Sequence, residues 1–270
     1  MKRMDRHRVK PGSRVELARH DPGSTGGFRG GKKKAAAELQ RLNERLEVLQ
    51  ELLWAEREHK VLVVLQGLDA SGKDGTIRHV FEGVNPAGVR VASFRVPTPD
   101  ELAHDFLWRV HPKVPGRGEL VIFNRSHYED VLAVRVLELA PRAVWEPRFE
   151  QIVAFEKLLA DTGTTVLKFF LHIDAEEQRE RFQARVDDPT KRWKFNPGDL
   201  DTRKLWERYV EAYEDALSRT ATDFAPWYVV PANKKWYRNL IVATVLVETL
   251  AGLDMRYPPG EPGLEGLVVE

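Results

Sequence analysis

The chain has 270 residues, of which 42% are hydrophobic, and a formal net charge of +1 at pH 7. This length and composition suffice for one large hydrophobic core. The absence of cysteine excludes disulfides, zinc–thiolate sites and cysteine nucleophiles. The start, MKRMDRHRVK, has no apolar segment, and no run approaches the roughly 18 apolar residues of a membrane span, so we expect a cytoplasmic protein with no membrane partner.

Residues 1–34 are expected to form a basic N-terminal arm ahead of a domain over residues 35–270. This segment holds eleven Lys and Arg against three acidic residues. It indicates either a polyanion partner (nucleic acid, a phosphate polymer or a neighbouring subunit) or a solvated tail. Lys32, Lys33 and Lys34 stand where a helix begins, and cations there oppose the helix dipole. That placement favours anion binding by these three lysines.

A long helix is predicted over residues 35–58. Its leucines recur at alternating spacings of three and four (Leu39, Leu42, Leu46, Leu49 and Leu53). This pattern indicates a face that packs in the core or between subunits.

A phosphate-binding loop follows the buried strand predicted from VLVVL, residues 61–65. The loop GLDASGKDG matches G-x-x-x-x-G-K-[ST] except at its last position, and a helix with one apolar face is predicted over residues 74–84. Strand, loop and helix together place a phosphate at a helix N-terminus. The expected phosphate-binding residues are Gly67, Ala70, Ser71, Gly72, Lys73, Asp74 and Gly75.

The loop carries two carboxylates in place of the usual hydroxyl. Asp74 stands where Ser or Thr would ligate Mg²⁺, and Asp69 lies inside the loop, whereas the later strand ELVIF ends in the neutral Asn124. Asp69 and Asp74 are therefore the predicted ligands of Mg²⁺, with Mn²⁺ as an alternative. The competing interpretation makes Asp74 an acid of the first helical turn, worth about 1 kcal/mol.

Four further strands are predicted over residues 89–96, 119–124, 164–173 and 227–231, with helical stretches between them. This alternation predicts an α/β fold with a mainly parallel sheet flanked by helices, and a ligand site at the carboxyl ends of the strands. Candidate nucleotide-binding residues are Asn124 and Arg125 at one strand end, and Phe106 and Arg109 in a segment expected near the acceptor pocket.

A helical lid is predicted at about residues 175–205. Two helices, over residues 175–188 and 202–219, flank a basic loop, an arrangement similar to the lids of small-molecule kinases. An ordinary exposed helical hairpin is the alternative. The candidate phosphate-binding cations of the lid are Arg181, Arg185, Lys191, Arg192 and Lys194.

No dedicated general base stands out, which favours an acceptor that is itself an ionised phosphate. His127 is the one exception, although a structural histidine is the commoner case.

Five segments closely resemble the polyphosphate kinase 2 family: VLVVLQGLDASGKDGTI, GVNPAGVRVASF, GELVIFNRSHYEDV, DDPTKRWKF and APWYVVPANKKWYRN. The resemblance runs from about residue 30 to residue 253. It implies a phosphate-loop kinase fold like that of thymidylate kinase, with a helical lid, and an enzyme that transfers phosphate reversibly between inorganic polyphosphate and nucleotides with Mg²⁺.

The resemblance also implies roles for single residues. Asp69 resembles the essential loop carboxylate, Lys73 the phosphate lysine and Arg125 the catalytic arginine. Arg181 resembles a lid arginine that faces polyphosphate, joining Lys32–Lys34 and the lid loop in binding it. Asn124 resembles the class III members, which phosphorylate both AMP and ADP to give ADP and ATP. The family's usual Trp is His127 here, so no role is inferred for it.

Relatives of this family commonly form dimers or tetramers, which the resemblance extends to this chain. Two other functions remain open. An ATP-dependent nucleoside or nucleoside-monophosphate kinase would share the fold and the lid. A noncatalytic polyanion binder would use the basic arm, but aromatic residues do not interleave with its cations, so we expect no nucleic acid partner.

Overall fold

Five parallel strands form the centre of the molecule in the order β2-β3-β1-β4-β5. The structure, a computed structural model, describes residues 4–264 and 267–269. The strands are β1 (Lys60–Gln66), β2 (Val89–Ser93), β3 (Leu120–Asn124), β4 (Thr164–His172) and β5 (Trp227–Pro231). Each lies within a few residues of its predicted range, and the sheet confirms the α/β fold of the phosphate-loop kinase type.

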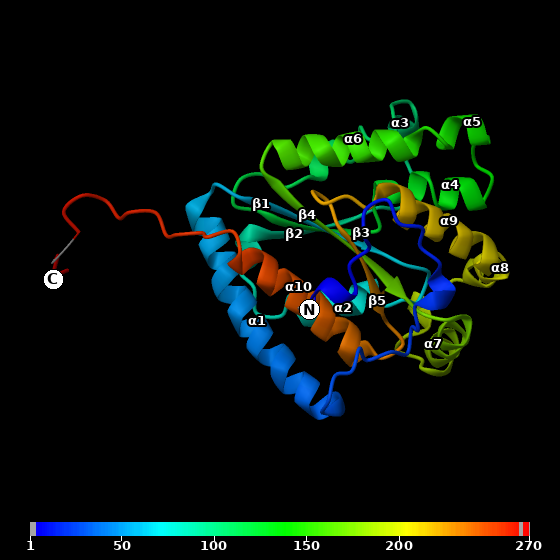
Figure 1. Cartoon of the computed structure of the whole chain (residues 1–270), viewed down its shortest axis with the longest axis horizontal. Helices are drawn as coiled ribbons and strands as arrows, with labels where there is room; N and C mark the ends of the chain where they lie inside the picture. The colour runs from blue at the N-terminus through cyan, green and yellow to red at the C-terminus, as the bar shows by residue number, and fades with distance from the viewer. Residues whose placement is uncertain (1–3, 265–266, 270) are drawn as a thin grey trace.

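Helices cover both faces of the sheet, with α1 and α10 side by side on one face and α6 and α9 on the other (Figure 1). The longer helices are α1 (Gly31–Glu56), α2 (Lys73–Val80), α6 (Arg148–Asp161), α7 (Ala175–Asp187), α9 (Trp206–Thr220) and α10 (Lys235–Ala251). The short ones are α3 (Pro99–Leu102), α4 (Ala133–Val136), α5 (Arg142–Trp145) and α8 (Gly198–Lys204).

The side chains of β1 alternate between two hydrophobic clusters. Leu62 and Val64 pack with residues of α6 and α9, whereas Val61, Val63 and Leu65 pack with α1, α2 and α10. All five are completely buried. A strand covered on both faces needs a continuous apolar run, which is why VLVVL was recognisable in the sequence.

The leucine-rich helix packs against α10 in the second cluster. Leu46, Leu49 and Leu53 are buried there. Of the two surfaces that the leucine pattern allows, the structure shows the core-packing one. The prediction of one helix over residues 202–219 is wrong. Two helices, α8 and α9, occupy this region, and they are separated at Leu205, which packs on the first cluster.

The N-terminal segment packs on the kinase domain, whereas its basic composition predicts an arm. Val9 donates its N–H to the carbonyl of Trp227, and Val229 donates to His7, both at 2.8 Å, alongside β5. Val15 and Leu17 are buried in the first cluster. The apolar residues that stand between the charged ones attach this segment to the core, so residues 4–34 do not form a separate structural unit.

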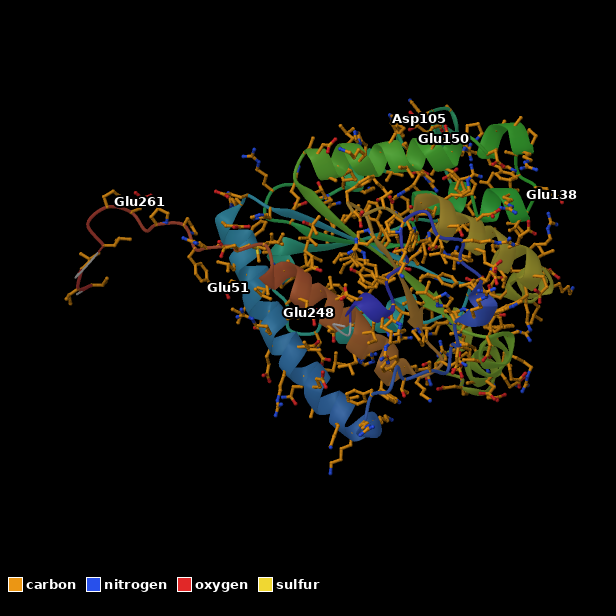
Figure 2. The ribbon with its side chains drawn as sticks, viewed as in Figure 1. Glu51, Asp105, Glu138, Glu150, Glu248 and Glu261 are labelled. Atoms are coloured by element: carbon orange, nitrogen blue, oxygen red, sulfur yellow. The ribbon has the colours of Figure 1, made fainter. Side chains whose placement is uncertain are left out.

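Acidic side chains such as Glu51, Glu150 and Glu248 are exposed on the outer helices (Figure 2). Beyond α10 the chain leaves the body as an exposed tail (Figure 1). Among the described residues no helix is both long enough and apolar enough to span a bilayer.

Candidate active site

The phosphate loop connects β1 to α2 at the carboxyl edge of the sheet. Gly67 and Gly72 have φ angles of 150° and 101°, and Ala70 has 62°, in the region that glycine favours. A Cβ on Gly72 would collide with the guanidinium of Arg238. Ser71 is fully buried, so its hydroxyl is not exposed on the surface of the loop.

Lys73 is folded back onto its own loop. Its Nζ donates to the carbonyl oxygens of Gly67 at 2.6 Å and Leu68 at 3.3 Å. Burial, and then the nearby charge of Arg125, lower the pKa of Lys73 to about 8. A bound phosphate would replace these carbonyls as the partner of the ammonium group.

Both predicted magnesium ligands have partners from the end of β3. Asp69 Oδ1 accepts a hydrogen bond from Arg125 Nη2 at 2.7 Å, and Asp74 Oδ1 accepts one from Asn124 Nδ2 at 2.7 Å. Because β1 and β3 are neighbours, the loop and the β3 end face each other. The structure thus brings together four of the residues predicted from separate parts of the sequence.

Arg125 is held in a strained conformation. Its φ of 60° is unusual for a residue with a side chain. Although burial opposes its charge, Glu129 and Asp69 together raise the pKa of Arg125 above its usual value. The guanidinium therefore stays charged and half-exposed over the loop.

Asp69 and Asp74 have the donor chemistry that Mg²⁺ accepts, and their role as its ligands stays a prediction. Among the described residues no group of three or more His, Cys, Asp or Glu side chains forms a ready-made metal cage. Mg²⁺ is commonly held by one or two carboxylates plus phosphate oxygens and water. In each carboxylate, Oδ1 accepts a hydrogen bond from a residue at the end of β3.

Glu129 is a further acidic residue of this site that the sequence reasoning missed. Its charge raises the pKa of Arg125 and acts on Lys73 and on Tyr213, whose pKa is raised chiefly by burial. Glu129 lies four residues after Arg125 in the stretch NRSHYED. That proximity to a strand end was the available signal.

The resemblance implies that Arg181 faces polyphosphate. In the structure, Arg181 lies under the phosphate loop. Its Nη1 donates to the carbonyls of Ala70 and Ser71, and its Nη2 to those of Ala232 and Asn233. Its Nε donates to Glu177. In this arrangement the side chain is committed to backbone carbonyls, and its contact with polyphosphate stays a prediction.

The other lid cations are accessible. The loop between α7 and α8 contains a 3₁₀ turn, Arg192–Lys194, and its Lys191, Arg192 and Lys194 side chains are exposed. Arg185, at the end of α7, is half-exposed. The pKa of Asp199 in α8 is raised by burial and then by the charge of Asp69.

Phe106 and Arg109 both have partners within the protein in this structure, and their contact with nucleotide stays a prediction. Arg109 is buried and donates to the carbonyl of Arg95 at 2.9 Å and to Glu101 at 3.5 Å. Phe106 packs on the first cluster beneath the guanidinium of Arg148. In the structure Arg109 supports the segment after β2, because a buried guanidinium needs acceptors.

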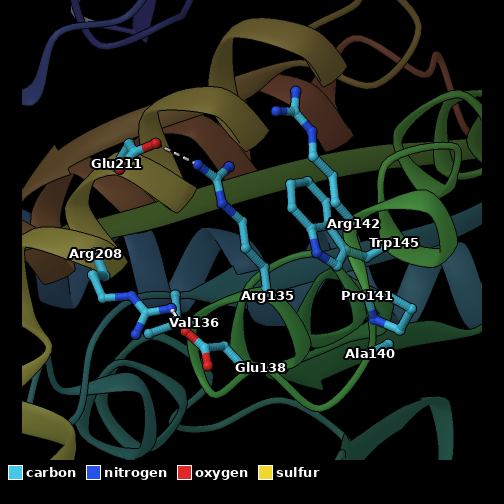
Figure 3. Close-up of a pocket in the computed structure, with 9 residues that line it drawn as sticks. All are labelled: Arg135, Val136, Glu138, Ala140, Pro141, Arg142, Trp145, Arg208 and Glu211. Carbon is cyan, nitrogen blue, oxygen red and sulfur yellow. Dashed lines mark hydrogen bonds and ion pairs between the residues drawn. The ribbon is translucent and has the colours of Figure 1, made fainter.

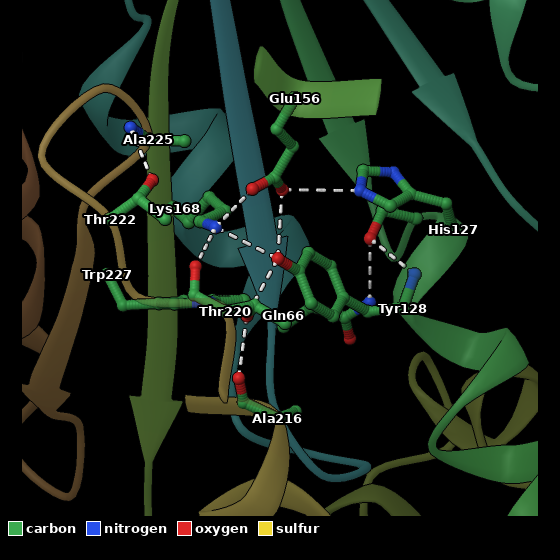
Figure 4. Close-up of polar contacts among 11 residues, drawn as sticks. Gln66, His127, Tyr128, Glu156, Lys168, Ala216, Thr220, Thr222, Ala225 and Trp227 are labelled. Atoms are coloured by element: carbon green, nitrogen blue, oxygen red, sulfur yellow. Dashed lines mark hydrogen bonds and ion pairs between the residues drawn. The ribbon is translucent and has the colours of Figure 1, made fainter. Parts of the chain in front are cut away.

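His127 belongs to a buried polar network with Tyr128, Glu156 and Lys168 (Figure 4). Its Nε2 lies 3.3 Å from Glu156, which accepts from Tyr128 at 2.9 Å and from Lys168 at 2.5 Å. All four side chains are completely buried. The structural interpretation of His127 is confirmed, since this network anchors the turn that follows Arg125.

Lys32, Lys33 and Lys34 lie exposed in the first turn of α1. The segment before them packs beside the start of α10, where Asn233 donates to Pro22 and Phe28 contacts Trp236. Their role in binding polyphosphate stays a prediction.

A separate pocket of about 570 Å³ lies between α4, α5 and α9 (Figure 3). Its arginines are paired with acids: Arg135 with Glu211 at 2.6 Å and Arg208 with Glu138 at 2.7 Å. No residue of the phosphate loop lines it. Arg142, the third arginine of the lining, pairs with Glu146 outside it, so all three arginines have acidic partners and the pocket adds nothing to the phosphate site.

A lysine-bearing loop between a central parallel strand and a helix, facing an arginine and carboxylates with no nucleophile of its own, is the arrangement of phosphate-loop phosphotransferases. The fold and the site thus define an enzyme of the kinase class.

The chain belongs to the polyphosphate kinase 2 family, whose model, described as "Polyphosphate kinase 2 (PPK2)", matches residues 30–258. It is 63% identical, over 99% of this chain and 100% of the relative, to the AMP/ADP-polyphosphate phosphotransferase of Meiothermus ruber. It is 44% identical, over 94% and 92%, to the ADP-polyphosphate phosphotransferase of Rhodopseudomonas palustris. The crystal structure of polyphosphate kinase 2 from Arthrobacter aurescens superposes with a TM-score of 0.93 at 42% identity, covering 97% of this chain and 93% of that one.

Proposed function

We propose that this enzyme transfers phosphate from inorganic polyphosphate to AMP and to ADP, giving ADP and ATP, with Mg²⁺ as its cofactor. The observation that carries the proposal is the 63% identity, across nearly the whole chain, to a relative named for both acceptors. We also propose a cytoplasmic homodimer or homotetramer.

The geometry supports a transfer that rests on positioning and charge neutralisation. Lys73 exchanges the carbonyls of Gly67 and Leu68 for a phosphate of the donor. Arg125 exchanges Asp69 for the phosphoryl group that is being transferred, whose charge is spread over its three equatorial oxygens. Bound Mg²⁺, held by Asp69 and Asp74, would neutralise phosphate charge.

The acceptor needs no general base in this scheme. A terminal phosphate oxygen of AMP or ADP is already ionised near pH 7, so no proton has to be removed before it attacks. The carboxylate of Asp69 accepts a hydrogen bond from Arg125, and the charge of Glu129 also acts on this guanidinium, so both carboxylates are engaged with a cation. The donor phosphate bond breaks as the new bond to the acceptor oxygen forms, and the shortened polyphosphate leaves with the charge.

Nucleotide turnover tests the proposal. Purified protein, Mg²⁺ and long-chain polyphosphate are given AMP or ADP separately, and the products are resolved by chromatography. We expect ADP and then ATP from AMP, and losses of at least about a hundredfold in Asp69→Asn and Lys73→Ala. Asp161→Asn and Lys157→Ala make the same chemical changes in an exposed ion pair of α6 and should leave turnover unchanged.

Reaction with ADP alone would contradict the use of AMP that Asn124 suggests. If AMP reacts with ATP and not with polyphosphate, the proposed donor is wrong and the enzyme is an ordinary ATP-dependent monophosphate kinase.

A further inference from the structure

The phosphate loop is backed by a second arginine, Arg238, from the first turns of α10. Its exposure is 2%, among the lowest of the charged residues. The guanidinium occupies the space next to Gly72 that a side chain there would fill, and it lies close to Gly75 as well. The loop therefore takes its shape around this side chain.

Arg238 has no carboxylate partner among the described residues. Its Nη1 donates to the carbonyl of Ser71 at 3.3 Å, and its Nε and Nη2 both donate to Oδ1 of Asn239. Arg181, beside it, has Glu177 as its ion-pair partner. Burial, and then the charge of Arg181, lower the pKa of Arg238 to about 9.

A buried charge without a counter-ion is costly, and proteins retain one where a ligand supplies the opposite charge. The only anion that the loop is built to admit is phosphate. The position behind Gly72 screens Arg238 from water, so its field reaches the loop undiminished by solvent.

We infer that Arg238 is a positioning residue of the phosphate loop: its buried charge draws phosphate into the loop, and the bound phosphate is its counter-ion. The inference rests on the proposed function in that the natural ligand is polyphosphate. It adds a cation that never touches the substrate to the contacts made by Lys73 and Arg125.

Two variants separate charge from shape. Arg238→Gln keeps hydrogen-bond donors for Ser71 or Asn239 but removes the charge, whereas Arg238→Lys keeps the charge. Arg78→Gln makes the same charge change on the exposed side of α2, where water screens it. The dissociation constant for inorganic tripolyphosphate is measured by calorimetry at pH 7, and unfolding without ligand is followed in urea.

We expect Arg238→Gln to raise the dissociation constant by about tenfold or more, the order of one poorly screened charge, with ligand-free stability unchanged or increased. Arg238→Lys should stay within about threefold of the wild type, as should Arg78→Gln. Equal binding by Arg238→Gln and the wild type would overturn the inference. So would equal losses of binding in the Gln and Lys variants, because shape rather than charge would then matter. A wild type that fails to bind tripolyphosphate would overturn the proposed donor and this inference together.

Discussion

At the scale of single residues, the resting site satisfies itself. Asp69 is paired with Arg125, Asp74 with Asn124, and Lys73 with its own loop. Each group that the reaction needs is thus occupied until substrate arrives. Substrate binding therefore exchanges one set of partners for another, and the substrate-free site has little energetic cost from unpaired charges.

Asn124→Asp tests why this strand ends in a neutral residue. The new carboxylate would lie within hydrogen-bond distance of Asp74, where Asn124 Nδ2 is now 2.7 Å from Oδ1. We expect the free energy of unfolding in urea at pH 7 to fall by about 1 kcal/mol, since like charges replace a hydrogen bond. Millimolar Mg²⁺ should reverse the loss by bridging the two carboxylates. A variant as stable as the wild type without Mg²⁺ would mean that Asp74 turns away to solvent.

Lys73 gives phosphate binding a dependence on pH. Its pKa is about 8 in the free loop, lowered by burial and by Arg125, and a bound polyanion favours the charged form and raises it. At pH 8.5 the free lysine is mostly neutral, so tripolyphosphate binding should take up about three quarters of a proton. At pH 6.5 the lysine is already charged, and this uptake should vanish.

Calorimetry in two buffers of different ionisation enthalpy measures this proton uptake. Lys73→Met serves as the control, because its remaining uptake at pH 8.5 belongs to other groups. Uptake that is the same in the variant would assign the proton elsewhere.

At the scale of elements, the lid presents Trp193 to solvent. This side chain is 77% exposed, in the turn that also carries Lys191, Arg192 and Lys194. If cations of this turn close over polyphosphate, the indole should leave water, and its fluorescence should shift to shorter wavelength on addition of polyphosphate. The difference between wild type and Trp193→Phe isolates this signal among seven tryptophans. An unchanged difference spectrum would favour the exposed hairpin.

Four of the five strands were predictable because they are buried on both faces and so read as apolar runs, whereas β2, VRVAS at the sheet edge, is mostly exposed and was indicated by its β-branched residues. The loop was predictable because its chemistry is local to residues 67–75. The two arginines beneath the loop were not predictable from the sequence. Arg181 and Arg238 contact Ser71 from 110 and 167 positions away along the chain. No local pattern says that an arginine on a later helix turns back beneath a glycine.

At the scale of the whole molecule, the N-terminal segment is part of the core. Val9, Val15 and Leu17 are buried, and backbone hydrogen bonds join this segment to β5. Removing residues 1–19 should therefore lower the free energy of unfolding by at least about 2 kcal/mol, because three buried side chains are lost. The midpoint of urea unfolding should fall accordingly. Replacing only Lys2, Arg3 and Arg6 with Gln is the control for lost charge. A truncated protein of wild-type stability would return the segment to the role of an arm.

The strand order also has a consequence for biosynthesis. The first strand to leave the ribosome, β1, is the central one, and its neighbours β3 and β4 are complete only at residues 124 and 172. At about 5–20 residues per second, the run VLVVL waits on the order of ten seconds for both partners. Arg238 follows later still. The nascent chain therefore carries VLVVL without a complete neighbouring strand until residue 124 and without its second neighbour until residue 172, and a chaperone can bind the strand during that interval.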